Sequence, residues 1–194
     1  MKQKFNIHEK QTAMKKLSLM LVAGLLSIAT FAQEKTVMVG GAAMYPSKNI
    51  IENAMNSKEH TTLVAAVKAA GLVETLQGAG PFTVFAPTNA AFDKLPAGTV
   101  GTLVKPENKA MLTTILTYHV VAGKWDSKAI AAKIKEGNGT AEFKTVQGGT
   151  LKASMKGGKL MLWDEKGGMA AVTIKDVSQS NGVIHVIDTV VMPK

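Results

Sequence analysis

The sequence predicts an α+β domain in which an N-terminal helical half packs on a C-terminal half of antiparallel strands. Two patterns predict this class. Apolar residues recur at helical spacing between Lys48 and Ile134. From Ala141 onward, apolar and polar residues alternate with the period of two that strands produce. A run of helices followed by a run of strands is typical of α+β domains.

Residues 1–32 have the layout of a secretory signal. A lysine pair precedes an apolar run that ends at Phe31, and the run is shorter than the roughly 20 apolar residues that a membrane span requires. We expect cleavage after the small residue Ala32, which leaves no membrane span. Met14 directly precedes the lysine pair. Residues 1–13 are therefore either an extended polar region of the signal or an upstream start that the cell does not use.

Composition limits what the rest of the chain does. The formal net charge of +9 falls to +5 once residues 1–32, with five lysines and one acid, are removed. Every cationic residue is lysine, which argues against nucleic-acid binding because that surface favours the arginine fork. The absence of cysteine excludes disulfides and thiolate zinc sites.

We expect a linker over residues 33–46 and one monomeric domain over residues 47–194. We expect this domain outside the cytoplasm, where it is periplasmic, secreted or at the cell surface.

Start and stop signals place the helices of the first half. Thr88 follows Pro87 as the start of one helix, and Pro106 falls in the first turn of another. Asp126 is the expected N-cap of a third helix, which ends at Gly137.

The strands are predicted from alternation and turn residues. Gly157-Gly158 fits a two-residue hairpin loop, which needs positive φ at both positions. The last expected strand, Gly182 to Met192, is apolar on nearly both faces and is therefore predicted to be central and covered twice. The expected strands are Phe82–Ala86, a strand around Leu151–Met155, Lys159–Trp163, a strand around Val172–Asp176, and Gly182–Met192.

No catalytic or metal-binding pattern stands out. Ser154 lacks the first glycine of a nucleophile elbow, so a hydrolase would need this or another serine placed against His119 or His185 by folding. His185 and Asp188 are three apart on a predicted strand and point to opposite faces. We expect no catalytic residues, no metal and no cofactor.

His119 lies on the apolar stripe of the helix that begins near Pro106, together with Leu112 and Leu116. The main interpretation is a structural imidazole that ties the end of this helix to the sheet, and the alternative is a ligand-binding or switch role. Tyr118 is expected to be half-buried with its hydroxyl at the surface.

Three segments, in this order, resemble the motifs of the fasciclin (FAS1) family of secreted and cell-surface adhesion modules, over about residues 47–193. The first, residues 82–92, includes Thr83, Phe85, Pro87, Thr88, Asn89 and Phe92. The second is Tyr118-His119-Val120-Val121, and the third, residues 181–188, includes Asn181, Gly182, His185 and Asp188. The first segment reads physically as a corner from strand to helix, in which Pro87 fixes the turn, Thr88 or Asn89 caps the helix, and Phe92 returns to the core.

The resemblance implies a wedge-shaped β-sandwich of two sheets with an N-terminal cluster of α-helices along one side. It also implies adhesion by binding and not catalysis. In animal relatives, integrin contact has been tied to the tyrosine-histidine motif and to an Asp-Ile pair. The matching candidate binding residues here are Tyr118, His119, Asp176 and Val177. The sequence departs from the family at Val177, which replaces the Ile, and at Ala90, where many relatives carry an acid.

The leading hypothesis is a secreted, non-enzymatic adhesion or binding module whose partner is a protein or polysaccharide of the cell surface or matrix. The alternative is a carrier of an apolar small molecule such as a carotenoid or lipid, since some algal relatives bind carotenoids. The chain has 11 methionines that would suit an adaptable apolar site, among them Met155, Met161, Met169 and Met192. An unrecognised hydrolase is the third hypothesis.

Overall fold

The computed structural model describes residues 35–194, so the predicted signal segment lies outside the described residues. The described helices are α2 (Ile50–Ala54), α3 (Thr61–Ala70), α4 (Val73–Gln77), α5 (Asn89–Asp93), α6 (Thr99–Leu103), the 3-10 turn η1 (Pro106–Asn108), α7 (Lys109–Tyr118) and α8 (Ser127–Glu136). The strands are β1 (Val37–Val39), β2 (Ala42–Met44), β3 (Phe82–Pro87), β4 (Val120–Ala122), β5 (Thr140–Lys144), β6 (Thr150–Lys156), β7 (Lys159–Trp163), β8 (Met169–Gln179) and β9 (Gly182–Ile187).

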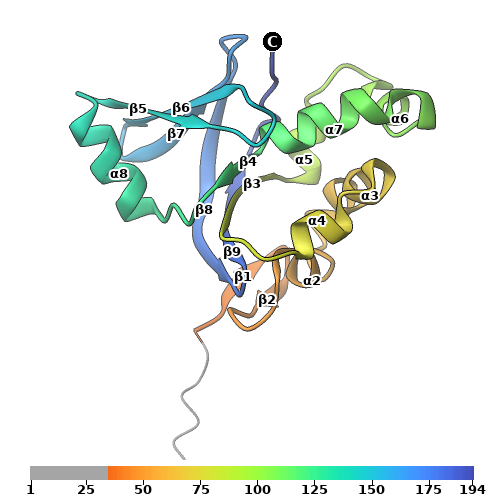
Figure 1. The fold of residues 1–194 in the computed structure, drawn as a ribbon, viewed down its shortest axis with the longest axis horizontal. Coiled ribbons are helices and arrows are strands. Elements are labelled where there is room, and N and C mark those ends of the chain that lie inside the picture. The colour runs from red at the N-terminus through yellow and green to blue at the C-terminus, as the bar shows by residue number, and fades with distance from the viewer. Residues whose placement is uncertain (1–34) are drawn as a thin grey trace, which may run out of the picture. The chain divides into compact units, whose positions relative to one another are not determined.

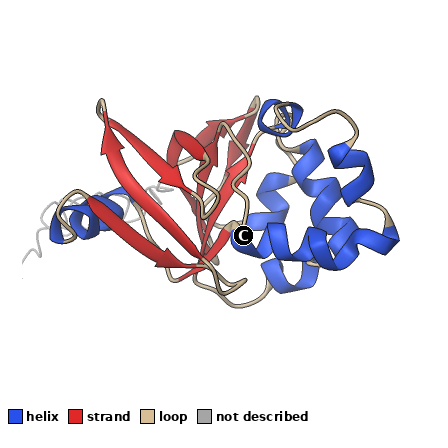
Figure 2. Ribbon diagram, turned by 90° about the horizontal axis from the view of Figure 1, so that it is seen from above, coloured by secondary structure: helices blue, strands red, loops and turns tan. Residues whose placement is uncertain are grey.

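The strands of the second half, together with β3 and β4, form a continuous ladder in the order β4-β3-β9-β8-β7-β6-β5. All neighbours are antiparallel except β3 and β9, which run parallel. The long strand β8 pairs with β9 along one part and with β7 along another, so it belongs to two sheets. The far edges meet where Val121 forms a bridge with Thr145. Figure 2 shows the strands converging at one end and spreading apart at the other, which gives the two sheets their wedge shape.

Strand β9 separates two hydrophobic cores. Every residue of β9 is buried, and its side chains alternate between the two faces. Ile184 and Val186 pack in the core beneath the helices. Ile187 packs in the core enclosed by β5, β6 and β7, and His185 stacks on Phe85 of that same core, with ring centroids 5.7 Å apart. The prediction of a central strand covered on both faces is therefore confirmed.

The helices are distributed unevenly over the two cores (Figures 1 and 2). Helices α2 to α7 cluster on one side of the strands and supply most of the first core. Helix α8 lies alone on the other side, where it contacts β5 and β6. The observed α+β class and the position of the helical cluster agree with the sequence-based expectation.

Several local signals have the predicted geometry. Thr88 caps α5 through its side chain, which accepts from the Ala91 amide, and Asp126 caps α8 in the same way. Gly157 and Gly158 form the expected hairpin loop, with φ of +57° and +76°.

Two boundaries differ from the prediction. The segment interpreted as a linker contains the β1–β2 hairpin, and Val39 and Met44 are buried in the first core. The domain therefore begins well before Ser47. Strands of three residues are too short to show alternation, so the segment has the local pattern of a linker. The last strand ends at Ile187 and not at Met192, although Val190 and Val191 remain buried.

Candidate functional site: three motifs and an apolar pocket

The first motif forms the expected corner between β3 and α5. Thr83 is fully buried, and its hydroxyl donates to the Gly123 carbonyl at 2.7 Å and accepts from the Trp125 amide at 2.8 Å. Pro87 ends β3, and Phe92 packs in the first core. This motif holds β3 to the segment that follows β4.

Asn89 has a different role from the one predicted, because Thr88 alone caps α5. The Asn89 side-chain oxygen accepts from the Thr62 amide at 3.0 Å, and its side-chain nitrogen donates to the Lys58 carbonyl at 3.0 Å. Since α3 has no cap from its own N-cap residue, Asn89 satisfies the start of α3 from the neighbouring corner.

Tyr118 lies in the second core and is fully buried, so the expectation of a surface hydroxyl was wrong. Its hydroxyl donates to the Thr150 carbonyl at 2.8 Å and accepts from the Glu165 amide at 3.2 Å. Burial raises the pKa of Tyr118 to about 12, which keeps the phenol neutral.

His119 is buried at the end of α7 and fits the structural interpretation. Its Nδ1 lies 2.8 Å from the Ile115 carbonyl, and its Nε2 accepts from the Val191 amide at 3.3 Å. A carbonyl only accepts and an amide only donates, so these partners require the neutral tautomer with the proton on Nδ1. Burial lowers the pKa of His119 to about 4.

His185 of the third motif is locked in the opposite tautomer. Its Nε2 donates to the Trp125 carbonyl at 2.8 Å, and its Nδ1 accepts from the Asp176 amide at 3.3 Å. Burial lowers the pKa of His185 as well. Both ring nitrogens of His119 and of His185 are thus engaged with backbone groups, and neither ring faces a serine as a hydrolase would need. Ser154, the serine considered for that role, accepts instead from the Trp163 indole at 2.9 Å.

The rest of the third motif joins the helices to the sheet. Asn181 donates to the carbonyls of Leu76 and Gly78 at 2.8 and 3.0 Å and accepts from the Ile50 amide at 3.1 Å. Gly182 is required because a Cβ there would collide with the Phe82 carbonyl oxygen.

Asp188 follows β9 and joins the end of this strand to β8. Its carboxylate accepts from the Ala171 amide at 2.8 Å and lies 3.7 Å from the Lys94 ammonium. Burial alone would raise the pKa of this carboxyl, but its hydrogen bonds and the lysine lower it.

Asp176 is half-buried at an irregularity of β8 and has a left-handed backbone, with φ of +61°. Its carboxylate accepts hydrogen bonds from the amide and from the hydroxyl of Ser127, at the start of α8. Burial alone would raise its pKa, but the Ser127 hydrogen bonds lower it. The neighbouring Val177 is buried in the first core.

The four candidate binding residues therefore do not form one surface. Tyr118 belongs to the second core, while Val177 belongs to the first. His119 is buried between α7 and the segment after β9, and Asp176 is only partly exposed beside α8. A partner would have to open the cores to touch three of these four side chains.

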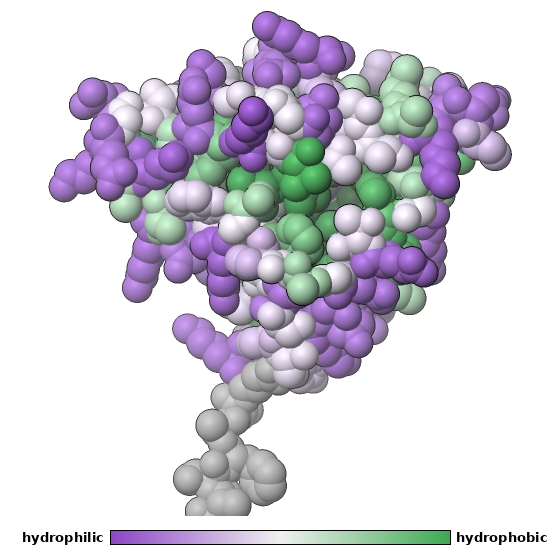
Figure 3. All heavy atoms as spheres, viewed as in Figure 1, coloured by the Kyte–Doolittle hydropathy of each residue, from purple (hydrophilic) through white to green (hydrophobic). Residues whose placement is uncertain are grey.

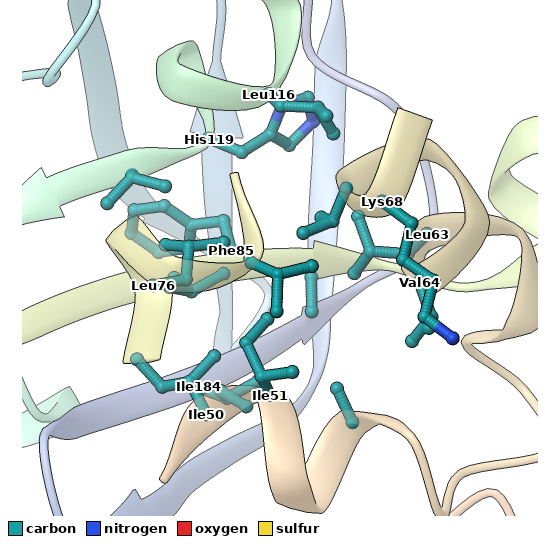
Figure 4. A pocket seen from close by; sticks show the side chains of 16 residues that line it. Ile50, Ile51, Leu63, Val64, Lys68, Leu76, Phe85, Leu116, His119 and Ile184 are labelled. Atoms are coloured by element: carbon teal, nitrogen blue, oxygen red, sulfur yellow. The ribbon is translucent and has the colours of Figure 1, made fainter. Parts of the chain in front are cut away.

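An apolar pocket of about 40 Å³ lies between the helical cluster and the sheet. Figure 4 shows side chains from α2, α3, α4, α7 and the strands converging on it. The lining is apolar apart from Lys68 and His119; its larger members include Ile50, Ile51, Leu63, Leu76, Leu116 and Ile184. Figure 3 shows apolar atoms gathered in a hollow near the centre of the face seen in Figure 1. The volume suits a few water molecules and no larger ligand unless the helices move.

This pocket could not be read from the sequence, because its lining comes from many separate elements. The four methionines singled out for an apolar site do not line it. Met155 and Met169 are instead exposed, by 49% and 42%, on the strands of the opposite half.

Comparisons with known proteins agree with this architecture. A sequence model of the Fasciclin domain matches residues 58–193. Protein sll1483 of Synechocystis sp. is 49% identical over 160 residues, which cover 82% of both chains. The immunogenic protein MPB70 of Mycobacterium bovis is 41% identical over 145 residues, covering 72% of this chain and 66% of the relative. The cell surface glycolipoprotein MPB83 of the same species is 36% identical over 170 residues, covering 85% of this chain and 70% of the relative.

A solved structure shows the same fold. The FAS1 domain pair of the insect cell adhesion molecule Fasciclin I superposes with a TM-score of 0.67 at 16% identity, covering 82% of this chain and 58% of that one. The fold and the three motifs define a fasciclin-type domain. The chain belongs to the fasciclin family.

Within residues 35–194, no helix is long and apolar enough to cross a membrane.

Proposed function

We propose that this protein is an exported adhesion module that acts by binding a protein or polysaccharide outside the cytoplasm, and not by catalysis. The observation that carries the proposal is the fasciclin domain itself, whose family model matches residues 58–193. Two similar proteins support it by name: MPB83 is a cell surface glycolipoprotein, and Fasciclin I is a cell adhesion molecule. The signal-like residues 1–32 supply the route of export.

The motif side chains act in this proposal as fold determinants. Tyr118 and His185 each use their polar atoms on backbone groups of other segments, and His119 joins α7 to the segment after β9. Changing them would alter binding by loosening the domain, while the partner itself contacts the outer surface.

The first test is a deletion strain of the host. Cells lacking the gene should attach less to surfaces and aggregate less, and the full-length wild-type chain should restore both. The protein recovered outside the cytoplasm should begin at Gln33. Unchanged attachment and aggregation, with no partner recovered by cross-linking on intact cells, would contradict the proposal.

The apolar pocket favours a second candidate function, the carriage of a small apolar molecule. Lys68, whose side chain is exposed, lies at the pocket and is placed to face an anionic head group, while the walls are mostly aliphatic. Because the pocket holds only about 40 Å³, a ligand would need the helices around it to move.

Purification from the host tests this candidate. The native protein should carry visible absorbance or an extractable lipid. Ala54→Leu, which fills the pocket wall, should lower the amount bound, whereas Ala131→Leu on the exposed face of α8 should not. A colourless, lipid-free native protein would remove this candidate.

A further inference from the structure

A second recess lies on the outer face of the sheet formed by β5, β6 and β7, and no motif residue lines it. Strand register places Glu142, Lys152 and Trp163 in one row across the three strands and Thr140, Ser154 and Met161 in the next. The alternate residues of these strands, such as Phe143 and Leu162, fill the second core. The two rows therefore line the outer face together.

This face is hollowed into an open groove of about 730 Å³. The volume lies within the range of small-ligand sites, roughly 300–1,000 Å³. Trp163 is the aromatic residue of the groove, and it is half-buried. Its indole N–H donates to the Ser154 hydroxyl at 2.9 Å, which fixes the ring over the sheet. The ring is thus oriented before any ligand arrives.

Polar groups surround the indole. Glu142 and Lys152 form an ion pair at 3.0 Å, and both side chains are more than half exposed. At the end of the groove, Asp164 is held by the amides of Lys166 and Gly168, and Glu165 by the amide of Thr150. Hydroxyls of Thr140 and Thr150 complete the polar lining. The groove offers both donors and acceptors next to one aromatic ring.

We propose that this groove binds a neutral saccharide chain. A sugar ring has an apolar C–H face that suits the indole and hydroxyls that both donate and accept, as the lining requires. The lining carries three carboxylates against two lysines, counting Lys194, which disfavours a polyanion. The inference rests on the proposed adhesion function and names its partner class.

The binding test uses the full secreted protein with cellohexaose, chitohexaose and laminarihexaose, followed by titration calorimetry. At least one neutral hexasaccharide should bind with saturation. Trp163→Ala should weaken this binding about tenfold or more, and Ser154→Ala, which frees the indole, should weaken it less. Met111→Ala, which changes a 58% exposed methionine on α7, is the matched surface control and should not change it.

Thermal unfolding of each variant shows whether the domain is intact, and Trp163→Phe keeps an aromatic face if Trp163→Ala unfolds. Failure of all three sugars to bind, equal binding by a folded Trp163→Ala protein, or preference for alginate would overturn the inference.

Complementation of the deletion strain distinguishes the saccharide groove from the adhesion function. If attachment needs the protein but Trp163→Ala restores it fully, the saccharide groove is wrong and the adhesion function stands. If the deletion has no effect on attachment, the adhesion function fails even where sugars bind.

Discussion

The motif side chains of this domain work as internal connectors. His119 and His185 each bridge a carbonyl and an amide, and they do so in opposite tautomers. A proton added to either ring would place an N–H against an amide N–H that already donates to that ring. The hydrogen bonds of both histidines therefore require neutral rings. Burial lowers the pKa of each ring, which keeps it neutral.

The protonation of His119 gives a pH prediction. The pKa of this ring falls from 6.5 to about 4 on folding, so the unfolded chain binds the proton first as the pH drops. The stabilisation is complete above pH 6.5 and is lost as the pH falls toward 4, by about 3 kcal/mol in all. Urea unfolding from pH 7 to about pH 4.5 should show this loss. Replacement of His119 by Gln should flatten the slope without abolishing it, because His60 and His185 are shifted in the same direction. If the free energy of unfolding of the wild type and of His119→Gln depended equally on pH, the lowered pKa of His119 would be contradicted.

The Asn181 amide, in the turn before β9, connects two helices, since it bonds to the start of α2 and to two carbonyls at the end of α4. In Asn181→Asp, a carboxylate would face the carbonyls of Leu76 and Gly78. We expect a loss of about 2 kcal/mol or more in the free energy of unfolding. Asn138→Asp, in an exposed turn, is the control and should cost little. A tolerated Asn181→Asp would mean that water replaces these bonds.

Among the elements, α8 depends on a contact distant in sequence. Asp126 caps it locally, as the sequence predicts, but Asp176 of β8 adds two hydrogen bonds to Ser127 at the same end. This contact explains the left-handed backbone of Asp176, because the irregularity of β8 turns the carboxylate toward the helix.

Removal of the Asp176 carboxylate should loosen α8. We expect Asp176→Ala to lower the free energy of unfolding by roughly 1–2 kcal/mol and to speed amide hydrogen exchange in the first turn of α8. Asp93→Ala, at an exposed position on α5, should do neither. Loss of partner binding in Asp176→Ala with unchanged exchange in α8 would instead indicate direct contact.

The β1–β2 hairpin is an element that the local sequence pattern does not predict. Its strands have three residues each, joined through Gly40 and Gly41, and the segment reads locally as a linker. Only its packing shows that Val39 and Met44 belong to the first core.

Two methionines of the hairpin, one buried and one exposed, test whether the hairpin contributes to stability. Met44→Ala should cost about 2–5 kcal/mol of stability, as buried methionines usually do. Met38→Ala changes a side chain that is 60% exposed and should stay within about 0.5 kcal/mol of wild type. Equal, small effects would show that the hairpin is only a linker.

At the scale of the whole molecule, the parallel pairing of β3 with β9 lies between the two hydrophobic cores. β3 and β9 are about a hundred residues apart, and together they carry both cores on their two faces. The first and third motifs lie on these strands, so a resemblance based on them identifies the fold. They also supply Phe85 and Ile184 to the wall of the apolar pocket, while the groove lies on the outer face of β5, β6 and β7.

The sequence alone determines the α+β class, a helix cap at Thr88 or Asn89, the cap at Asp126, the glycine hairpin loop and the family. Each depends on residues near one another in the chain or on ordered motifs. Only the tertiary structure decides that the Tyr118 hydroxyl is buried, that Asn89 caps α3, and that Trp163 faces an open groove. These outcomes depend on which strands pair and on which face each side chain lies. Strand pairing joins segments that are far apart in the chain, such as β3 and β9, and no local pattern contains that register.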